Sequence, residues 1–391
     1  MNPQDGALWS RNFTLSCLAN FFYFGSFYLL LPILPQYVDT LGGTPAQVGL
    51  VTGLYTMAAV LIRPYFGQLA DRIGRKKVMM IGAGCFTLLF MLYGLVNAIY
   101  PLYIMRVSHG LAHAAFLAAS AAYIADLAPP ARRGEAMGVY GTSNVIAMAL
   151  FPAWGTAVIS RTGDFNYLFG LSAAVAGAAF LCILLVKDLA VANYGGRPAG
   201  SFLAVGKRRE VLMPALALFG GATTYGAIIA FLPLFAPQQG ISDIGIFFTA
   251  FAASTVASRV FIGKLSDRIG RQRVILPCMA LVVGAVLMLA QLSSSEMLII
   301  IALLYGFGFG AFMPTLNALV VDYTPPQDRG VALGFFTAFM DLGITAGAVV
   351  LGFAGEKFGY TAMFNSSAVV AIISIAVFVI GMRKVGVQPR E

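Results

Sequence analysis

The sequence predicts an all-α integral membrane protein of twelve transmembrane helices, arranged as two pseudo-symmetric six-helix bundles. Three observations lead to this prediction: a charge-poor composition, a succession of long apolar runs, and an internal repeat with one constant offset. Of the 391 residues, 59% are hydrophobic and 10% are charged, whereas a soluble domain carries about 25% charged residues. So few charges cannot cover a water-facing surface, and we expect lipid to be the solvent for most of the chain.

The net charge and the cysteines agree with a membrane protein. A net charge of +9 would suggest a nucleic-acid partner in a soluble protein, but basic residues also collect in the cytoplasmic loops of membrane proteins, so we expect no nucleic acid. Cys17, Cys85, Cys182 and Cys278 stand alone in apolar runs, which predicts neither a disulfide nor a metal site. The first residues, MNPQDGALWSRNFTL, do not resemble a signal peptide, because they lack a basic region and a small-residue cleavage site.

Twelve apolar runs are long enough to cross the hydrocarbon, which needs about 20 residues per helix. They lie at 13–37, 46–69, 77–97, 100–125, 134–160, 165–187, 210–236, 242–265, 273–292, 295–322, 329–355 and 361–384. The longest polar segment, 188–209, is predicted to be a cytoplasmic linker between an N-terminal bundle (1–187) and a C-terminal bundle (210–391).

The distribution of basic residues predicts the orientation. Lys and Arg recur in the breaks that follow the even-numbered spans, and the opposite breaks offer only Arg161 and Lys357. The positive-inside rule then places both termini in the cytoplasm, and an even number of spans agrees. We therefore expect a multi-pass protein of the cell inner membrane.

A shift of 196 residues aligns the two halves of the chain. It places GQLADRIGRKK (67–77) on GKLSDRIGRQR (263–273), and it also places Gly110 on Gly306 and Asp126 on Asp322. One constant offset across spans 2, 4 and 5 predicts a tandem duplication of a six-helix unit. Both copies have the same orientation because six is an even number.

These motifs resemble those of the major facilitator superfamily over essentially the whole chain. GQLADRIGRKK matches the signature of the family's loop between helices 2 and 3, and LYIMRVSHG (102–110) is similar to its helix 4 signature. RPYFGQLADRIGR together with LPILPQY resembles the drug/proton antiporter-like branch, which includes sugar-efflux and metallophore exporters. FPAWGT (151–156) departs from the glycine-rich helix 5 signature of antiporters, although Pro152 and Gly155 are kept.

The resemblance implies that the two loops gate transport. It places Asp71 against the start of helix 11 and Asp267 against the start of helix 5, where a carboxylate meets a positive helix end. It also implies an Arg75–Asp126 contact with a counterpart in the second half. Such links are expected when the halves close on the cytoplasmic side; the alternative is a tight turn that only sets topology. The predicted gating residues are Gly67, Asp71, Arg72, Gly74, Arg75, Asp126, Gly263, Asp267, Arg268, Gly270, Arg271 and Asp322.

Polar groups within spans are the candidates for substrate binding and proton coupling, because a charge there costs about 2.5–3.5 kcal/mol on insertion scales. Asp341 is the only acid deep in a span; burial favours its neutral form, so it could exchange a proton against substrate. His109 and His113 share a helix face with Arg106, and a metal there would lack a third ligand. The alternative for each residue is ordinary packing. The candidates are Arg106, Asp341, His109, His113, Asn20, Asn144 and Tyr225.

The sequence contains no nucleophile–base pair, phosphate-binding loop or metal-ligand box, so we expect neither an enzyme nor a bound cofactor. We expect a monomeric secondary transporter that moves a small organic solute by alternating access, with the proton gradient as its energy source and export as its direction. Two alternatives stay open: proton-coupled uptake of a small organic anion, and, outside the class, a passive channel.

Overall fold

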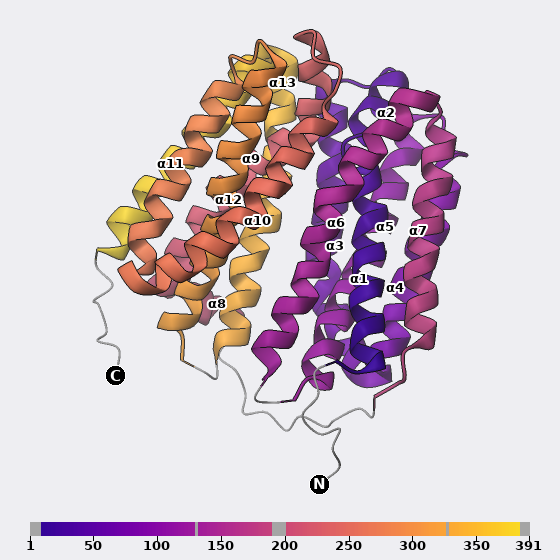
Figure 1. Cartoon of the computed structure of the whole chain (residues 1–391), viewed down its shortest axis with the longest axis vertical. Helices are drawn as coiled ribbons and strands as arrows, with labels where there is room; N and C mark the ends of the chain where they lie inside the picture. Colours follow the sequence, from indigo (N-terminus) through magenta and orange to yellow (C-terminus); the bar gives the residue numbers. More distant parts are fainter. Residues whose placement is uncertain (1–8, 130–131, 190–200, 326–327, 384–391) are drawn as a thin grey trace. The chain divides into compact units, whose positions relative to one another are not determined.

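The computed structural model describes residues 9–129, 132–189, 201–325 and 328–383, apart from the side chains of Lys264 and Asp267. The regular elements within these ranges are all helices (Figure 1). The chain divides into two compact units, and each is described by itself. Unit 1 comprises 1–43 and 54–193, and unit 2 comprises 44–53 and 194–391.

The helices follow the predicted spans. The first seven are α1 (Arg11–Leu30), α2 (Leu34–Thr40), α3 (Pro45–Ile73), α4 (Arg75–Tyr93), α5 (Ile99–Leu127), α6 (Arg133–Thr162) and α7 (Phe165–Leu185). The others are α8 (Phe202–Gly206), α9 (Arg209–Gln238), α10 (Gly245–Ile269), α11 (Arg271–Leu289), α12 (Ser295–Tyr323) and α13 (Arg329–Met382).

Eleven apolar helical segments in the described ranges are long enough to cross a membrane. The last of them, α13, contains two spans, because Gly359 adopts a non-helical backbone (φ 81°, ψ 166°) in its interior. Counting its two parts separately gives the predicted twelve. The first span is also interrupted: residues 31–33 form a turn between α1 and α2. Pro32 has no backbone N–H to continue α1, and Pro35 lies in the first turn of α2, where proline is tolerated.

The duplication predicted from the sequence is present in the backbone. Helices α4 and α11 begin and end 196 residues apart, as do α5 and α12. The glycine that precedes α4 and α11 has the same unusual conformation in each half, with φ 102° at Gly74 and φ 96° at Gly270. The two units therefore repeat one fold.

The packing of helices also repeats. In unit 1, α4 packs on α5, and α1 packs on α6 and α7; in unit 2, α11 packs on α12, and α9 packs along α13. The same close approach occurs twice: a Cβ on Gly110 would lie 2.3 Å from the main-chain oxygen of Tyr55, and a Cβ on Gly306 would lie 2.4 Å from that of Phe251. Small residues let membrane helices approach to this distance.

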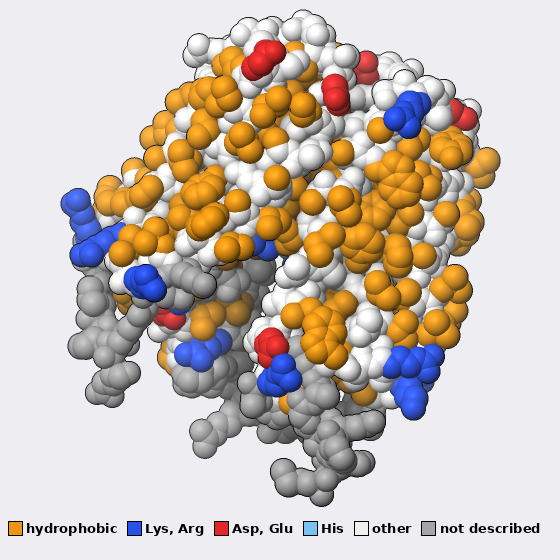
Figure 2. Space-filling model, viewed as in Figure 1, with side chains coloured by type: hydrophobic (Ala, Val, Ile, Leu, Met, Phe, Trp, Pro, Cys, Tyr) orange, Lys and Arg blue, Asp and Glu red, His pale blue; other side chains and the backbone are white. Residues whose placement is uncertain are grey.

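The surface agrees with a lipid-embedded protein. Figure 2 shows hydrophobic side chains over much of this face, with few charged side chains among them. Large apolar residues such as Leu61, Leu95, Tyr100 and Ile104 are more than two-thirds exposed. In water such a surface would be unstable, but in a bilayer it faces hydrocarbon.

Candidate functional site

The loop between α3 and α4 consists of a single non-helical residue. Residues 67–73 continue α3, Gly74 takes φ 102° and ψ 144°, and Arg75 begins α4. Side chains other than glycine rarely adopt this conformation, so Gly74 has a backbone reason to be glycine. The turn expected over the whole motif is therefore confined to Gly74, and Asp71 and Arg72 stand in the last turn of α3.

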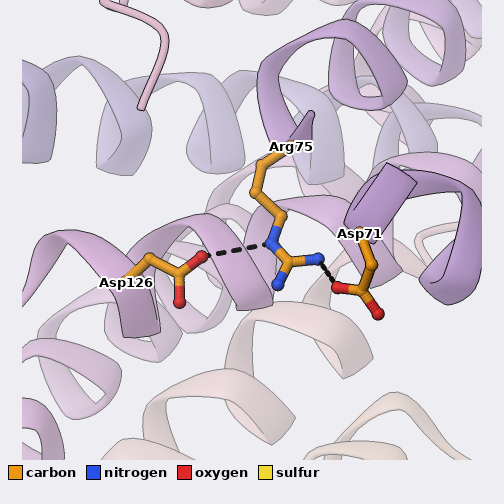
Figure 3. Close-up of polar contacts among 3 residues, drawn as sticks. All are labelled: Asp71, Arg75 and Asp126. Carbon is orange, nitrogen blue, oxygen red and sulfur yellow. Dashed lines mark hydrogen bonds and ion pairs between the residues drawn. The ribbon is translucent and has the colours of Figure 1, made fainter. Parts of the chain in front are cut away.

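Arg75 joins three helices of unit 1 (Figure 3). Its Nε donates to Asp126 Oδ2 at the end of α5, at 3.1 Å, and a terminal guanidinium nitrogen donates to Asp71 Oδ1. The Arg75 side chain is 17% exposed, whereas that of Asp71 is 62% exposed. The predicted Arg75–Asp126 contact is thus present. However, both partners belong to unit 1, so the expectation that this pair requires closure of the two halves is wrong.

The second copy of the motif has the same pair. Arg271 Nε donates to Asp322 Oδ2 at 2.5 Å, and Arg271 also lies 3.5 Å from the Ser266 hydroxyl. Arg268 lies in the last turn of α10. The predicted role of Asp267 concerns a side chain outside the described residues. In each unit, therefore, an arginine holds the start of one helix to the end of the next.

Gly67 and Gly263, the first residues of the two motifs, are not required by packing within their units. A Cβ on either would meet no atom within 4 Å. Both are helical; Gly67 is half-buried and Gly263 is exposed. If these glycines act in gating, as predicted, the reason is not packing inside one unit.

A chain of hydrogen bonds runs from α5 to α4 in unit 1. The Arg106 guanidinium lies 4.3 Å above the Tyr55 ring and also interacts with the Tyr93 hydroxyl. Tyr93 Oη lies 3.1 Å from His109 Nδ1, and His109 Nε2 lies 3.3 Å from the Phe86 carbonyl. Since the carbonyl only accepts, Nε2 carries the proton and Nδ1 accepts from Tyr93. Both nitrogens of His109 therefore have partners within unit 1.

His113, one turn further along α5, has a different environment. Its Nδ1 is buried and has no hydrogen-bond partner in the described part of the chain. Rings from α1 and α3 surround it: Tyr23 and Phe24 at centroid distances of 5.8 and 5.7 Å, and Tyr55 at 5.3 Å. Of the two histidines, His113 is the one with a buried polar atom left available. No group of three or more His, Cys, Asp or Glu that could hold a metal occurs among the described residues.

Asn20 and Asn144 both join α1 to α6. The Asn20 amide donates to the Tyr140 carbonyl at 3.1 Å and to the Ser143 hydroxyl at 2.8 Å. Tyr28 donates to Asn144 Oδ1 at 3.0 Å. The structure thus gives both asparagines a bracing contact between helices. The close approach of these helices also explains Gly155, where a Cβ would lie 2.2 Å from the Leu29 main-chain oxygen.

The remaining candidates, Tyr225 and Asp341, lie in unit 2. Tyr225 stacks on Phe309 at 5.1 Å, and Phe309 stacks on Tyr305 at 5.7 Å. The main-chain oxygen of Asp341 accepts from the Thr345 hydroxyl at 2.9 Å, and its side chain is half-buried. With the 196-residue offset, Tyr305 and Phe309 take the positions of His109 and His113. Unit 2 therefore has an aromatic stack where unit 1 has the two histidines.

Two contacts were not found by sequence reasoning. Arg208 donates to Asp328 Oδ2 at 2.8 Å, and the Ala46 N–H donates to Glu356 Oε2 at 3.1 Å. Asp328 directly precedes α13, a position at which an acidic residue suits the start of a helix. Nothing in the sequence, however, pairs it with a residue of the predicted linker. Glu356 directly follows the span predicted at 329–355, and nothing in the sequence pairs it with Ala46.

Comparison with known proteins identifies the family. The model of the Major Facilitator Superfamily matches residues 16–247 and 215–390. The chain belongs to the major facilitator superfamily. It is a multi-pass membrane transporter and not an enzyme.

Individual relatives agree with this assignment. The chain is 27% identical to the multidrug resistance protein MdtG of Salmonella typhi, over 96% of each chain. Its fold is similar to that of the nucleoside transporter NupG (TM-score 0.75, 17% identity, 95% of this chain and 99% of that chain). It is also similar to that of the human organic anion transporter MFSD10 (TM-score 0.70, 19% identity, 94% of this chain and 99% of that chain).

Proposed function

We propose that this transporter exports a small organic solute in exchange for protons, in the inner membrane and with both termini cytoplasmic. The observation that carries the proposal is the Arg–Asp brace repeated at the duplicated motif, Arg75–Asp126 in one half and Arg271–Asp322 in the other. A matched pair of such motifs, both predicted on the cytoplasmic side, suits a carrier whose two halves close at that side. The name of the relative MdtG favours export of organic compounds.

Asp341 is the proposed coupling residue, because no other acid lies deep in a span. A carboxyl in the membrane can hold a proton in one state of the carrier and release it in another. His113 is the proposed substrate contact, because its buried Nδ1 has no partner in the described part of unit 1. Arg106 and His109 hold the helix that carries it.

The test is dye transport by everted inner-membrane vesicles that contain the protein. Export from cells corresponds to uptake into these vesicles, so respiration should drive ethidium inward and a protonophore should abolish the uptake. Asp341→Asn should remove the dependence on respiration while passive exchange of ethidium persists. Glu356→Gln, a carboxyl change at the end of the same span, serves as the control. Uptake that ignores the protonophore would contradict proton coupling.

Uptake of an organic anion is the second candidate, and the buried Arg106 favours it because a guanidinium suits a carboxylate. The similarity of the fold to that of a human organic anion transporter agrees with this candidate. Fluorescein is the matched anionic probe. If energised whole cells that contain the protein accumulate fluorescein, and their ethidium content is unchanged, this candidate is favoured. Flux of either dye that never saturates would indicate a channel.

A further inference from the structure

The end of the predicted linker is an ordered part of unit 2. Residues 202–206 form the short helix α8, whose Val205 is fully buried. Its amides are bonded, since Val205 N–H donates to the Ser201 carbonyl at 2.9 Å and Lys207 N–H donates to the Leu203 carbonyl at 3.0 Å. α8 packs on α13, the helix that Asp328 directly precedes. This segment is therefore more than a flexible connection.

Two contacts hold the segment on one face of α13. Arg208 donates to Asp328 at the helix start, and Phe202 lies against Phe335 with ring centroids 5.4 Å apart. Positions 328 and 335 are seven residues apart, so they share a helix face. Gly206 lets the backbone lie against the Phe335 ring, because a Cβ there would come within 2.2 Å of it.

The Arg208–Asp328 pair has a strong electrostatic reason to stay intact. The Asp328 side chain is only 8% exposed, and Arg208 brings its charge to 2.8 Å. Removing the arginine would leave a buried carboxylate without this partner, which is unfavourable, whereas removing both charges also removes the charge that Arg208 compensates. Asp328→Asn should therefore reverse the effect of Arg208→Ala.

The equivalent residues in the first half of the chain have other partners. The residue 196 positions before Asp328 is Arg132, which pairs with the nearby Glu135 at 2.8 Å in an exposed position. The residue 196 positions before Arg208 is Asn12, whose Oδ1 accepts from the Lys187 N–H at 3.1 Å. The contact therefore does not follow from the duplicated fold, and it belongs to the junction between the halves.

We propose that Phe202–Arg208 is a clamp that fixes the start of α13, and that Arg208 and Asp328 are positioning residues for the transport cycle. The start of this helix is the part that the family resemblance implicates in gating. The role in transport rests on the proposed function, whereas the clamp itself does not.

Hydrogen exchange of the purified full-length protein tests the clamp without any substrate. Arg208→Ala should speed the exchange of residues 202–208 and of the first turns of α13 by about tenfold, because the buried carboxylate loses its ion pair with Arg208. Arg208→Ala combined with Asp328→Asn should return both segments to within about twofold of the unmodified protein. Arg209→Ala, which changes the exposed neighbour, is the matched control and should leave exchange unchanged.

Ethidium transport by vesicles tests the positioning role. Arg208→Ala should lower Vmax by about fivefold with an unchanged KM, and the double variant should restore it. A double variant that exchanges as fast as Arg208→Ala, or an Arg208→Ala protein with unchanged exchange, would overturn the clamp. Altered exchange with an unchanged Vmax would overturn the positioning role. If the unmodified protein moves no ethidium, the proposed function fails, and hydrogen exchange still decides on the clamp.

Discussion

At the scale of single residues, the two histidines of α5 have different roles although the sequence presents them alike. They lie four residues apart on one helix, which places them on one face. His109 uses both ring nitrogens within unit 1, for Tyr93 and for the Phe86 carbonyl. His113 keeps a buried Nδ1 without a partner in the described residues. We infer that His109 fixes the helix and that His113 is available for chemistry.

This difference predicts unequal stability of two matched variants. His109→Phe keeps a ring of similar size but removes the hydrogen bonds to the Tyr93 hydroxyl and to the Phe86 carbonyl, and each lost hydrogen bond costs about 0.5–1.5 kcal/mol. His113→Phe should cost less, because its Nδ1 makes no bond in the described structure. Thermal unfolding in detergent should give the lower midpoint for His109→Phe. Equal midpoints would contradict a bracing role for His109.

At the scale of helices, most of the fold follows from the sequence, because lipid imposes long apolar runs and leaves few alternatives. The span predicted at 100–125 is α5 (Ile99–Leu127), and the duplicated loops end their helices as expected. Contacts that join distant segments were not predictable. Arg208 and Asp328 are 120 positions apart, and only the fold brings them together. The brace formed by Arg75 was known only through the family resemblance.

Glycines at the helix pairs give a prediction at this scale. Gly110→Ala or Gly306→Ala would push a methyl group against a main-chain oxygen 2.3 or 2.4 Å away, and backbone cannot move aside as a flexible side chain can. We expect a loss of stability of about 1–3 kcal/mol in each case, as for other overpacked sites. Thermal unfolding should show nearly the same loss in both halves.

The matched controls are Gly67→Ala and Gly263→Ala. These positions are helical and open, with no atom within 4 Å of an added Cβ, and alanine is the better helix former by about 1 kcal/mol. Their unfolding midpoints should not fall. If ethidium transport nevertheless declines in these variants, the glycines are needed in another state of the transport cycle. A fall in their midpoints would show that packing requires them after all.

At the scale of the whole molecule, we propose that the duplicated loops govern the alternation between two states. The Asp71 side chain is 62% exposed. Its contribution to the protein therefore does not come from burial within unit 1. The proposed role is to favour the state that is closed on the cytoplasmic side. Asp71→Asn removes the charge but keeps the shape, so it should shift the population toward the inward-open state.

Cysteine labelling in intact cells and in everted vesicles measures this shift. A membrane-impermeant maleimide should react faster from the cytoplasmic face, and more slowly from the outer face, with reporter cysteines placed in helix α5 of a cysteine-free Asp71→Asn protein. Charge-assisted contacts contribute about 1.5–3 kcal/mol, which corresponds to at least a roughly tenfold change in the ratio of the two states. Glu135→Gln is the control, because Glu135 is an exposed acid near the same end of unit 1. It is not part of the repeat, since the residue 196 positions later is Val331. Unchanged labelling on both faces in Asp71→Asn would leave the loop with a topological role alone.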